Sequence, residues 1–206
     1  MAVDLPGHPH GAALDRLEAL AGALAPAVAS LGGPRVLIGH SLGGAIALEL
    51  ARTRPSLVDG LVLIASGARL PVPDAVLEGV RRDPDAERRR LMEAFVADTD
   101  RPIAREVQAA LAECGDEVLA ADYAACAAAD LRGRLAGVRA PALLIAGGHD
   151  GLTPPWLSEE LARELPMAQL ILVPGARHMP MADADVTVNL LAAAFLARLE
   201  LTLAGP

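Results

Sequence analysis

Four short apolar runs, separated by helical segments and glycine-containing turns, constrain the fold of this chain more than any other feature. They cover residues 35–39, 61–65, 142–146 and 169–173. Their apolar residues are consecutive rather than alternating, which is typical of parallel strands buried on both faces. Helical periodicity is visible in 11–31, 42–54 and 183–199. The alternation predicts an α/β fold with a mostly parallel sheet and helices on both of its faces.

Residues 68–138 interrupt this rhythm. The segment is charged and rich in alanine, it predicts several short helices, and it contains no convincing strand. We therefore expect one α/β domain built from residues 1–67 and 139–206, with residues 68–138 inserted into it. Where the α/β pattern resumes, Thr153-Pro154-Pro155 predicts a helix start, with Thr153 as the N-cap and proline in the first turn.

Charge and composition argue against several classes of partner. All 18 basic residues are arginine and the net charge is −8. The densest cluster, Arg88–Arg90, follows acidic residues, so it predicts a solvated mixed-charge helix face rather than a nucleic-acid site. No apolar run is long enough to span a membrane, and no secretory signal is visible, so we expect a cytoplasmic protein. Cys114 and Cys126 lack metal or redox spacing, and we expect no disulfide framework.

The sharpest local signal is Gly39-His40-Ser41-Leu42-Gly43-Gly44, between a predicted strand and a predicted helix. It fits G-x-S-x-G, in which a serine sits on a tight strand-to-helix turn and flanking glycines leave room for that turn. An incidental serine in a glycine-rich turn is the alternative interpretation. A P-loop is excluded because no lysine follows, and Asp59 precedes its strand, which disfavours a dinucleotide site.

Two further loops supply the partners that a serine nucleophile needs. Asp150 follows the strand at 142–146, and His178 follows the strand at 169–173. The carboxyl ends of parallel strands lie at one edge of a sheet, so Ser41, Asp150 and His178 should converge there. Their order along the chain, Ser-Asp-His, is the order expected for a triad on this kind of fold.

These motifs resemble those of the α/β-hydrolase superfamily, in the capped branch of enol-lactonases, small esterases and cofactor-free haloperoxidase-like enzymes. The matching pieces are Val3–His8, Gly39–Gly44, Gly147–Pro154 and Gly175–His178. The resemblance implies that Ser41 is the nucleophile, Asp150 the acid, His178 the base and the Leu42 N–H an oxyanion donor. It implies no metal or other cofactor, and it makes residues 68–138 a substrate-selecting lid.

The N-terminus departs from the family pattern. The motif at Val3–His8 normally follows three more strands and a His-Gly loop that supplies a second oxyanion donor, so we expect an N-terminally truncated domain. The strand at 35–39 would then have an exposed apolar edge, through which a homodimer could form. His8 and His10 are a weak candidate for a metal pair, since no carboxylate is near them in sequence.

The sequence thus predicts a serine hydrolase of small esters, lactones or related acyl compounds, acting through an acyl-enzyme. Two alternatives stay open. One is a catalytically impaired fragment or binding remnant that keeps the triad. The other is perhydrolysis, which uses the same three residues.

Overall fold

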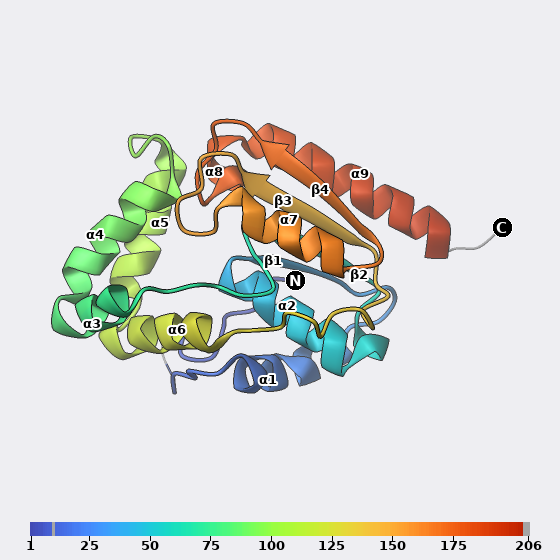
Figure 1. Cartoon of the computed structure of the whole chain (residues 1–206), viewed down its shortest axis with the longest axis horizontal. Helices are drawn as coiled ribbons and strands as arrows, with labels where there is room; N and C mark the ends of the chain where they lie inside the picture. Colours follow the sequence, from blue (N-terminus) through green and yellow to red (C-terminus); the bar gives the residue numbers. More distant parts are fainter. Residues whose placement is uncertain (10, 204–206) are drawn as a thin grey trace.

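Four parallel strands form the central sheet of the computed structural model, which describes residues 1–9 and 11–203 (Figure 1). Their spatial order follows the sequence: β1 (Val36–His40), β2 (Gly60–Ile64), β3 (Ala142–Gly147) and β4 (Ala168–Val173). Each predicted strand is confirmed, with ends shifted by at most one residue. The short apolar runs are reliable signals because both faces of the inner strands are buried.

Helices cover both faces of this sheet. Helices α1 (Leu17–Ala29), α2 (Leu42–Thr53) and α7 (Pro155–Glu164) pack on one face, and α9 (Asp185–Leu203) packs on the other. Alternate residues of β2 divide between the two cores: Leu61 and Leu63 face the first group of helices, whereas Val62 and Ile64 face α9. This two-sided burial confirms the predicted α/β architecture.

The outer strands β1 and β4 are less covered. The side chain of Ile38 in β1 is 58 % exposed, and that of Leu172 in β4 is 45 % exposed. Within residues 1–9 and 11–203, no strand pairs with the outer side of β1. The homodimer that the sequence suggests through this edge stays a prediction.

The segment between β2 and β3 is helical, as predicted. It contains α3 (Asp74–Arg82), α4 (Pro84–Phe95), α5 (Pro102–Glu113) and α6 (Asp116–Ala128), which lie together at one end of the sheet in Figure 1. An isolated antiparallel bridge between Arg69 and Asp130 joins the two ends of this segment. The insertion therefore leaves the core and returns to it at the same place. Its role as a lid, and the domain boundaries, remain predictions.

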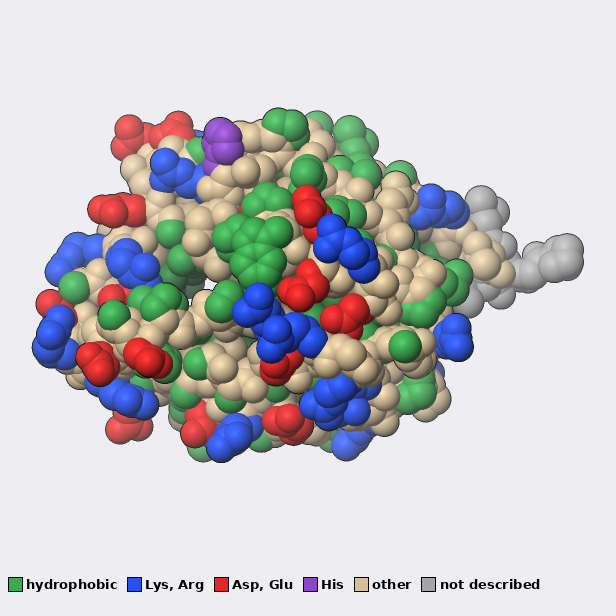
Figure 2. Space-filling model, in the orientation of Figure 1, with side chains coloured by type: hydrophobic (Ala, Val, Ile, Leu, Met, Phe, Trp, Pro, Cys, Tyr) green, Lys and Arg blue, Asp and Glu red, His purple; other side chains and the backbone are tan. Residues whose placement is uncertain are grey.

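Two arginines of the α4 cluster, Arg88 and Arg90, are paired with carboxylates. Arg88 contacts Asp85 at 3.0 Å and Asp116 at 2.8 Å, and Arg90 contacts Glu87 at 2.8 Å. Acidic and basic side chains are interspersed over the face drawn in Figure 2. Among the described residues, no helix is long and apolar enough to cross a membrane.

Candidate active site

Ser41 occupies the strained turn between β1 and α2. Its backbone has φ 51° and ψ −118°, although it is not glycine. Two contacts hold the turn: the Ser41 N–H donates to the carbonyl of Ile64 at 2.9 Å, and the Ser66 hydroxyl donates to the carbonyl of Ser41 at 2.8 Å. Strained residues persist where their surroundings fix them, and such positions gather at active sites.

The glycines around Ser41 do not contribute equally to the turn. A Cβ on Gly39 would lie 2.4 Å from the carbonyl oxygen of Gly43, and a Cβ on Gly44 would lie 2.7 Å from the Cβ of Ser66. A Cβ on Gly43 would meet nothing within 4 Å. The prediction that flanking glycines make room for the turn is therefore right for Gly39 and wrong for Gly43. Gly44 is the second glycine that the packing requires.

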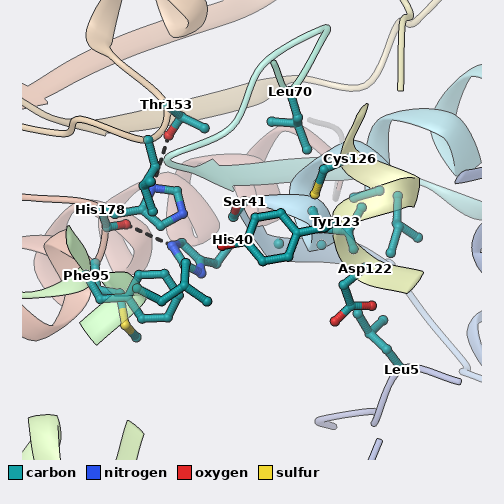
Figure 3. A pocket seen from close by; sticks show the side chains of 18 of the residues that line it. Leu5, His40, Ser41, Leu70, Phe95, Asp122, Tyr123, Cys126, Thr153 and His178 are labelled. Atoms are coloured by element: carbon teal, nitrogen blue, oxygen red, sulfur yellow. Dashed lines mark hydrogen bonds between the residues drawn. The ribbon is translucent and has the colours of Figure 1, made fainter. Parts of the chain in front are cut away.

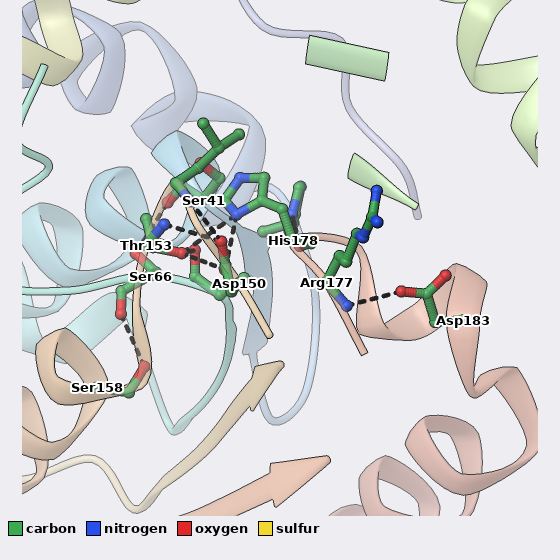
Figure 4. A network of polar contacts seen from close by, with 11 residues as sticks. Ser41, Ser66, Asp150, Thr153, Ser158, Arg177, His178 and Asp183 are labelled. Atoms are coloured by element: carbon green, nitrogen blue, oxygen red, sulfur yellow. Dashed lines mark hydrogen bonds and ion pairs between the residues drawn. The ribbon is translucent and has the colours of Figure 1, made fainter. Parts of the chain in front are cut away.

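Asp150 and His178 form a buried pair at the carboxyl end of the sheet (Figure 4). Nδ1 of His178 lies 2.9 Å from Oδ2 of Asp150, and only 2 % of His178 and 4 % of Asp150 is exposed. The other carboxylate oxygen, Oδ1, accepts the N–H groups of Leu152 at 2.8 Å and Thr153 at 2.9 Å. An ionised carboxylate can only accept, so Nδ1 carries the proton and Nε2 is free to act as a base.

These contacts decide the charge of Asp150. Burial raises the pKa of its carboxyl, but the hydrogen bonds from His178 and Thr153 outweigh burial and bring the pKa below its usual value. Asp150 is therefore an anion at neutral pH, as the orienting acid of a triad must be.

Thr153 has a different role from the predicted one. Helix α7 begins at Pro155, with Pro154 as its N-cap residue and no side-chain cap. The hydroxyl of Thr153 instead lies 2.6 Å from Oδ2 of Asp150, 2.9 Å from the carbonyl of Ala65 and 3.2 Å from Nδ1 of His178. The prediction of a helix cap was wrong because an anionic carboxylate is a better partner for this hydroxyl. The Asp-x-x-Thr spacing is the sequence signal that could have shown it.

Ser41 and His178 line one cavity, which lies between the core and the helical insertion (Figure 3). Its volume is about 1400 Å³. Most of its wall is apolar; the lining includes Leu5, Leu70, Leu91, Phe95, Leu119 and Leu152. The Ser41 hydroxyl makes no hydrogen bond to the residues that the structure describes. A catalytic serine–histidine hydrogen bond is often long or misaligned until substrate binds.

The fourth predicted residue, Leu42, is the first residue of α2. Its N–H therefore has no acceptor within the helix, and the helix dipole adds partial positive charge at this end. Leu42 and Ser41 line the same cavity. The structure thus brings all four predicted residues, Ser41, Leu42, Asp150 and His178, to one end of the sheet.

Other potentially nucleophilic side chains that line the cavity are held protonated. Burial raises the pKa of the Cys126 thiol to about 12, and it also raises the pKa of Cys114. The pKa of Tyr123 is raised, again by burial, to about 12. A thiol reacts as its thiolate, and a phenol is likewise a better nucleophile as its anion. The two cysteines and Tyr123 are therefore poor competitors of Ser41.

His8, one of the two histidines considered as a metal pair, contacts a carboxylate of the helical insertion. Nε2 of His8 lies 3.0 Å from Oδ2 of Asp122 in α6, and His10 is outside the described residues. Within the described part of the chain, no cluster of three or more metal-ligating side chains occurs. His8 therefore links the N-terminal segment to the helical insertion.

The loop that carries His178 is also bound to the end of α4, a contact that sequence reasoning missed. The Met179 N–H donates to the carbonyl of Phe95 at 2.7 Å. The carboxylate of Asp183 accepts hydrogen bonds from two backbone N–H groups. Oδ2 accepts from Arg177 at 2.7 Å, and Oδ1 accepts from Ala97 at 2.8 Å. The insertion and the candidate base are thus physically connected.

Comparison with known proteins identifies the family of this chain. A profile described as "Alpha/beta hydrolase family" matches residues 1–190. Pimeloyl-[acyl-carrier protein] methyl ester esterase of Neisseria meningitidis serogroup C is 35 % identical over 200 residues, which cover 87 % of this chain and 75 % of the relative. The protein with the same name from Aromatoleum aromaticum is 34 % identical over 199 residues, covering 85 % of this chain and 78 % of the relative.

Solved structures give the same fold. A thermophilic esterase from Thermogutta terrifontis superimposes with a TM-score of 0.82 at 27 % identity, covering 95 % of this chain and 78 % of that one. The enol-lactonase from Burkholderia xenovorans LB400 superimposes with a TM-score of 0.86 at 23 % identity, covering 94 % of this chain and 79 % of that one. The chain belongs to the alpha/beta hydrolase family, and within it the chain is an enzyme of the esterase type.

Proposed function

We propose that this protein hydrolyses small carboxylic esters, lactones or related acyl compounds through a Ser41–His178–Asp150 triad. The observation that carries the proposal is the buried 2.9 Å contact between His178 and Asp150 beside the strained Ser41 turn. A serine is a weak nucleophile unless a positioned base takes its proton, and the pair supplies that base.

The chemistry follows from the positions of these groups. Nε2 of His178 takes the proton of the Ser41 hydroxyl as its oxygen attacks the ester carbonyl carbon. The Leu42 N–H donates to the oxygen that becomes negative. His178 then gives its proton to the leaving alcohol, and an acyl-enzyme remains. Water, deprotonated by the same imidazole, then attacks the acyl carbon. As the bond to Ser41 breaks, the imidazole returns that proton to the Ser41 oxygen, and the carboxylic acid is released.

The cavity supports an acyl substrate with an apolar chain, since most of its wall is apolar. The helices of residues 74–128 cover this cavity, and we infer that residues 68–138 act as the lid that selects the acyl group. The relatives named above act on a methyl ester, so methyl esters of aliphatic acids are the first substrates to test.

The test combines labelling with turnover. The protein is treated with a fluorophosphonate, the adduct is mapped by mass spectrometry, and methyl and p-nitrophenyl esters are assayed. We expect the label on Ser41 and no turnover by Ser41→Ala. Asp150→Asn should lower kcat by about 10⁴, because the imidazole is then held in the wrong tautomer.

Ser30→Ala is the matched control, since Ser30 is exposed and, among the described residues, its hydroxyl bonds only the carbonyl of Ala27. This variant should be labelled by the fluorophosphonate at Ser41 and should hydrolyse the esters as fast as the unaltered protein. A label on another serine, retained in Ser41→Ala, contradicts the proposal.

A further inference from the structure

The side chain of His40, the residue before Ser41, contacts the backbone of His178. Its Nε2 lies 2.8 Å from the carbonyl oxygen of His178, and the two imidazole rings are 4.7 Å apart (Figure 3). The two residues are far apart in the sequence: His40 is the last residue of β1, and His178 lies in the loop between β4 and α8. The sequence pattern presents His40 only as the variable position of the G-x-S-x-G motif.

The chemistry of this contact fixes the state of His40. A backbone carbonyl can only accept a hydrogen bond, so Nε2 must carry a proton and donate it. Burial lowers the pKa of His40 to about 3, and a charge on the nearby His178 would lower it as well. His40 is therefore a neutral imidazole, protonated at Nε2, throughout the pH range in which an esterase works.

The surroundings leave the ring little freedom. On one side it lies near His178, and on another the ring of Phe95, the last residue of α4, meets it edge-on with the centroids 6.5 Å apart. The N–H of His178 donates to the carbonyl of Ala94 at 3.4 Å. The backbone of His178 is thus held through its carbonyl by the nucleophile turn, and its N–H approaches the helical insertion.

We propose that His40 is a positioning residue, which sets the distance between the nucleophile and the base by holding the backbone carbonyl of His178. The inference rests on the proposed function, because it assigns the distance between Ser41 and His178 a role in catalysis. Ser41 is joined covalently to His40, so the contact ties the two reacting residues together. Small displacements in such a pair are costly, because proton transfer needs aligned groups.

The test compares side chains that keep or lose the donor. His40→Gln retains an N–H near the position of Nε2, whereas His40→Phe keeps a flat ring without any donor. We expect His40→Phe to lower kcat and the rate of fluorophosphonate labelling at least about tenfold, as for loss of a buried hydrogen-bond partner. His40→Gln should stay within a few-fold of the unaltered protein, and KM should change little in both.

Two further measurements, active-site titration and NMR, separate a positioning role from loss of stability and from failure of the proposed function. Titration gives the concentration of intact active sites, to which each rate is normalised. If His40→Phe does not fold, His40→Leu replaces it, because leucine is closer to histidine in volume. Nitrogen-15 NMR of the histidine rings in the resting protein reports the His40 tautomer without any turnover.

The outcomes are distinct. Equal rates in the unaltered protein and His40→Phe, or equal losses in His40→Phe and His40→Gln, overturn the positioning role. An Nδ1–H tautomer for His40 excludes the contact itself. Absence of any label on Ser41 in the unaltered protein refutes the proposed function instead, and the tautomer still decides whether the contact exists.

Discussion

Thr153 holds the carboxylate of Asp150 through two groups: its N–H donates to Oδ1 at 2.9 Å, and its hydroxyl lies 2.6 Å from Oδ2. The same hydroxyl lies 2.9 Å from the carbonyl of Ala65, and its single proton can serve only one of these acceptors at a time. Ala65 is itself strained, with φ 48°. Asp150 is therefore oriented by a residue that does not belong to the triad.

Replacing this hydroxyl should slow catalysis. Thr153→Val keeps the shape of the side chain and the backbone N–H but removes the contact with Oδ2. A hydrogen bond to a charged group contributes about 1.5–3 kcal/mol, so we expect kcat for p-nitrophenyl esters to fall at least about tenfold. Thr53→Val is the matched control, because Thr53 is the exposed last residue of α2 and its hydroxyl bonds the carbonyl of Glu49. Equal kcat values for the two variants would contradict the role of Thr153.

The two glycines of the G-x-S-x-G motif should respond oppositely to alanine. Gly39→Ala places a methyl group 2.4 Å from the carbonyl oxygen of Gly43, which belongs to the backbone, so the turn itself must shift to make room. We expect a protein that fails to fold or loses several kcal/mol of stability, as when a core is overpacked (about 1–3 kcal/mol or more). Gly43→Ala meets no atom, and in a helix it should be neutral or stabilise by up to about 1 kcal/mol.

Urea unfolding followed by circular dichroism measures both variants. A Gly39→Ala protein as stable as the unaltered chain would show that the turn relaxes easily. Loss of activity in a stable Gly43→Ala protein would indicate instead that substrate approaches this position closely.

Acid should destabilise the fold partly through His40. The pKa of its imidazole is about 3 in the folded protein, mainly because of burial, against 6.5 as the ordinary value. Between these two values the unfolded chain binds a proton that the folded chain excludes, so stability falls as pH decreases through this window. One such group contributes a slope of about 1.4 kcal/mol per pH unit.

The free energy of unfolding, measured in urea at pH 7, 5.5 and 4.5, tests this sign. We expect His40→Gln to lose less stability than the unaltered protein on acidification, because glutamine does not titrate. Identical slopes for both proteins would mean that His40 can be protonated in the folded state.

Asp183 should couple the helical insertion to the loop of the candidate base. Both of its oxygens accept backbone N–H groups, one from Ala97 and one from Arg177. In Asp183→Asn the amide NH₂ must face one of these donors, so one contact is lost and that donor is left unpaired. We expect faster hydrogen exchange in both 93–101 and 175–183, and a several-fold lower kcat.

Asp185→Asn is the control for this prediction. Asp185 is an exposed residue whose ion pair with Arg101 spans 3.6 Å, and exposed pairs contribute little. It should leave exchange in both segments unchanged. If Asp183→Asn accelerates exchange in 93–101 alone, the two segments are not coupled through Asp183.

Much of the site could be predicted because its signals are local. The strands are continuous apolar runs, and each candidate residue follows one of them directly, so parallel topology alone places Ser41, Asp150 and His178 at one edge. The chain order Ser-Asp-His narrows the choice of fold further. The helical character of 74–128 was also predictable, since it depends on composition and spacing within the segment.

What the sequence alone determined is therefore the set of elements and the identity of the chemistry-bearing residues. Only the tertiary structure decided which neighbours hold them: Thr153 on Asp150, His40 on the carbonyl of His178, and Asp183 between Arg177 and Ala97. It also decided that Gly39 and Gly44, rather than Gly43, are the glycines that the turn requires. The physical reason is that periodicity and turn chemistry act between near neighbours. Most of these contacts instead join atoms that only the assembled sheet and the docked insertion bring within hydrogen-bond distance.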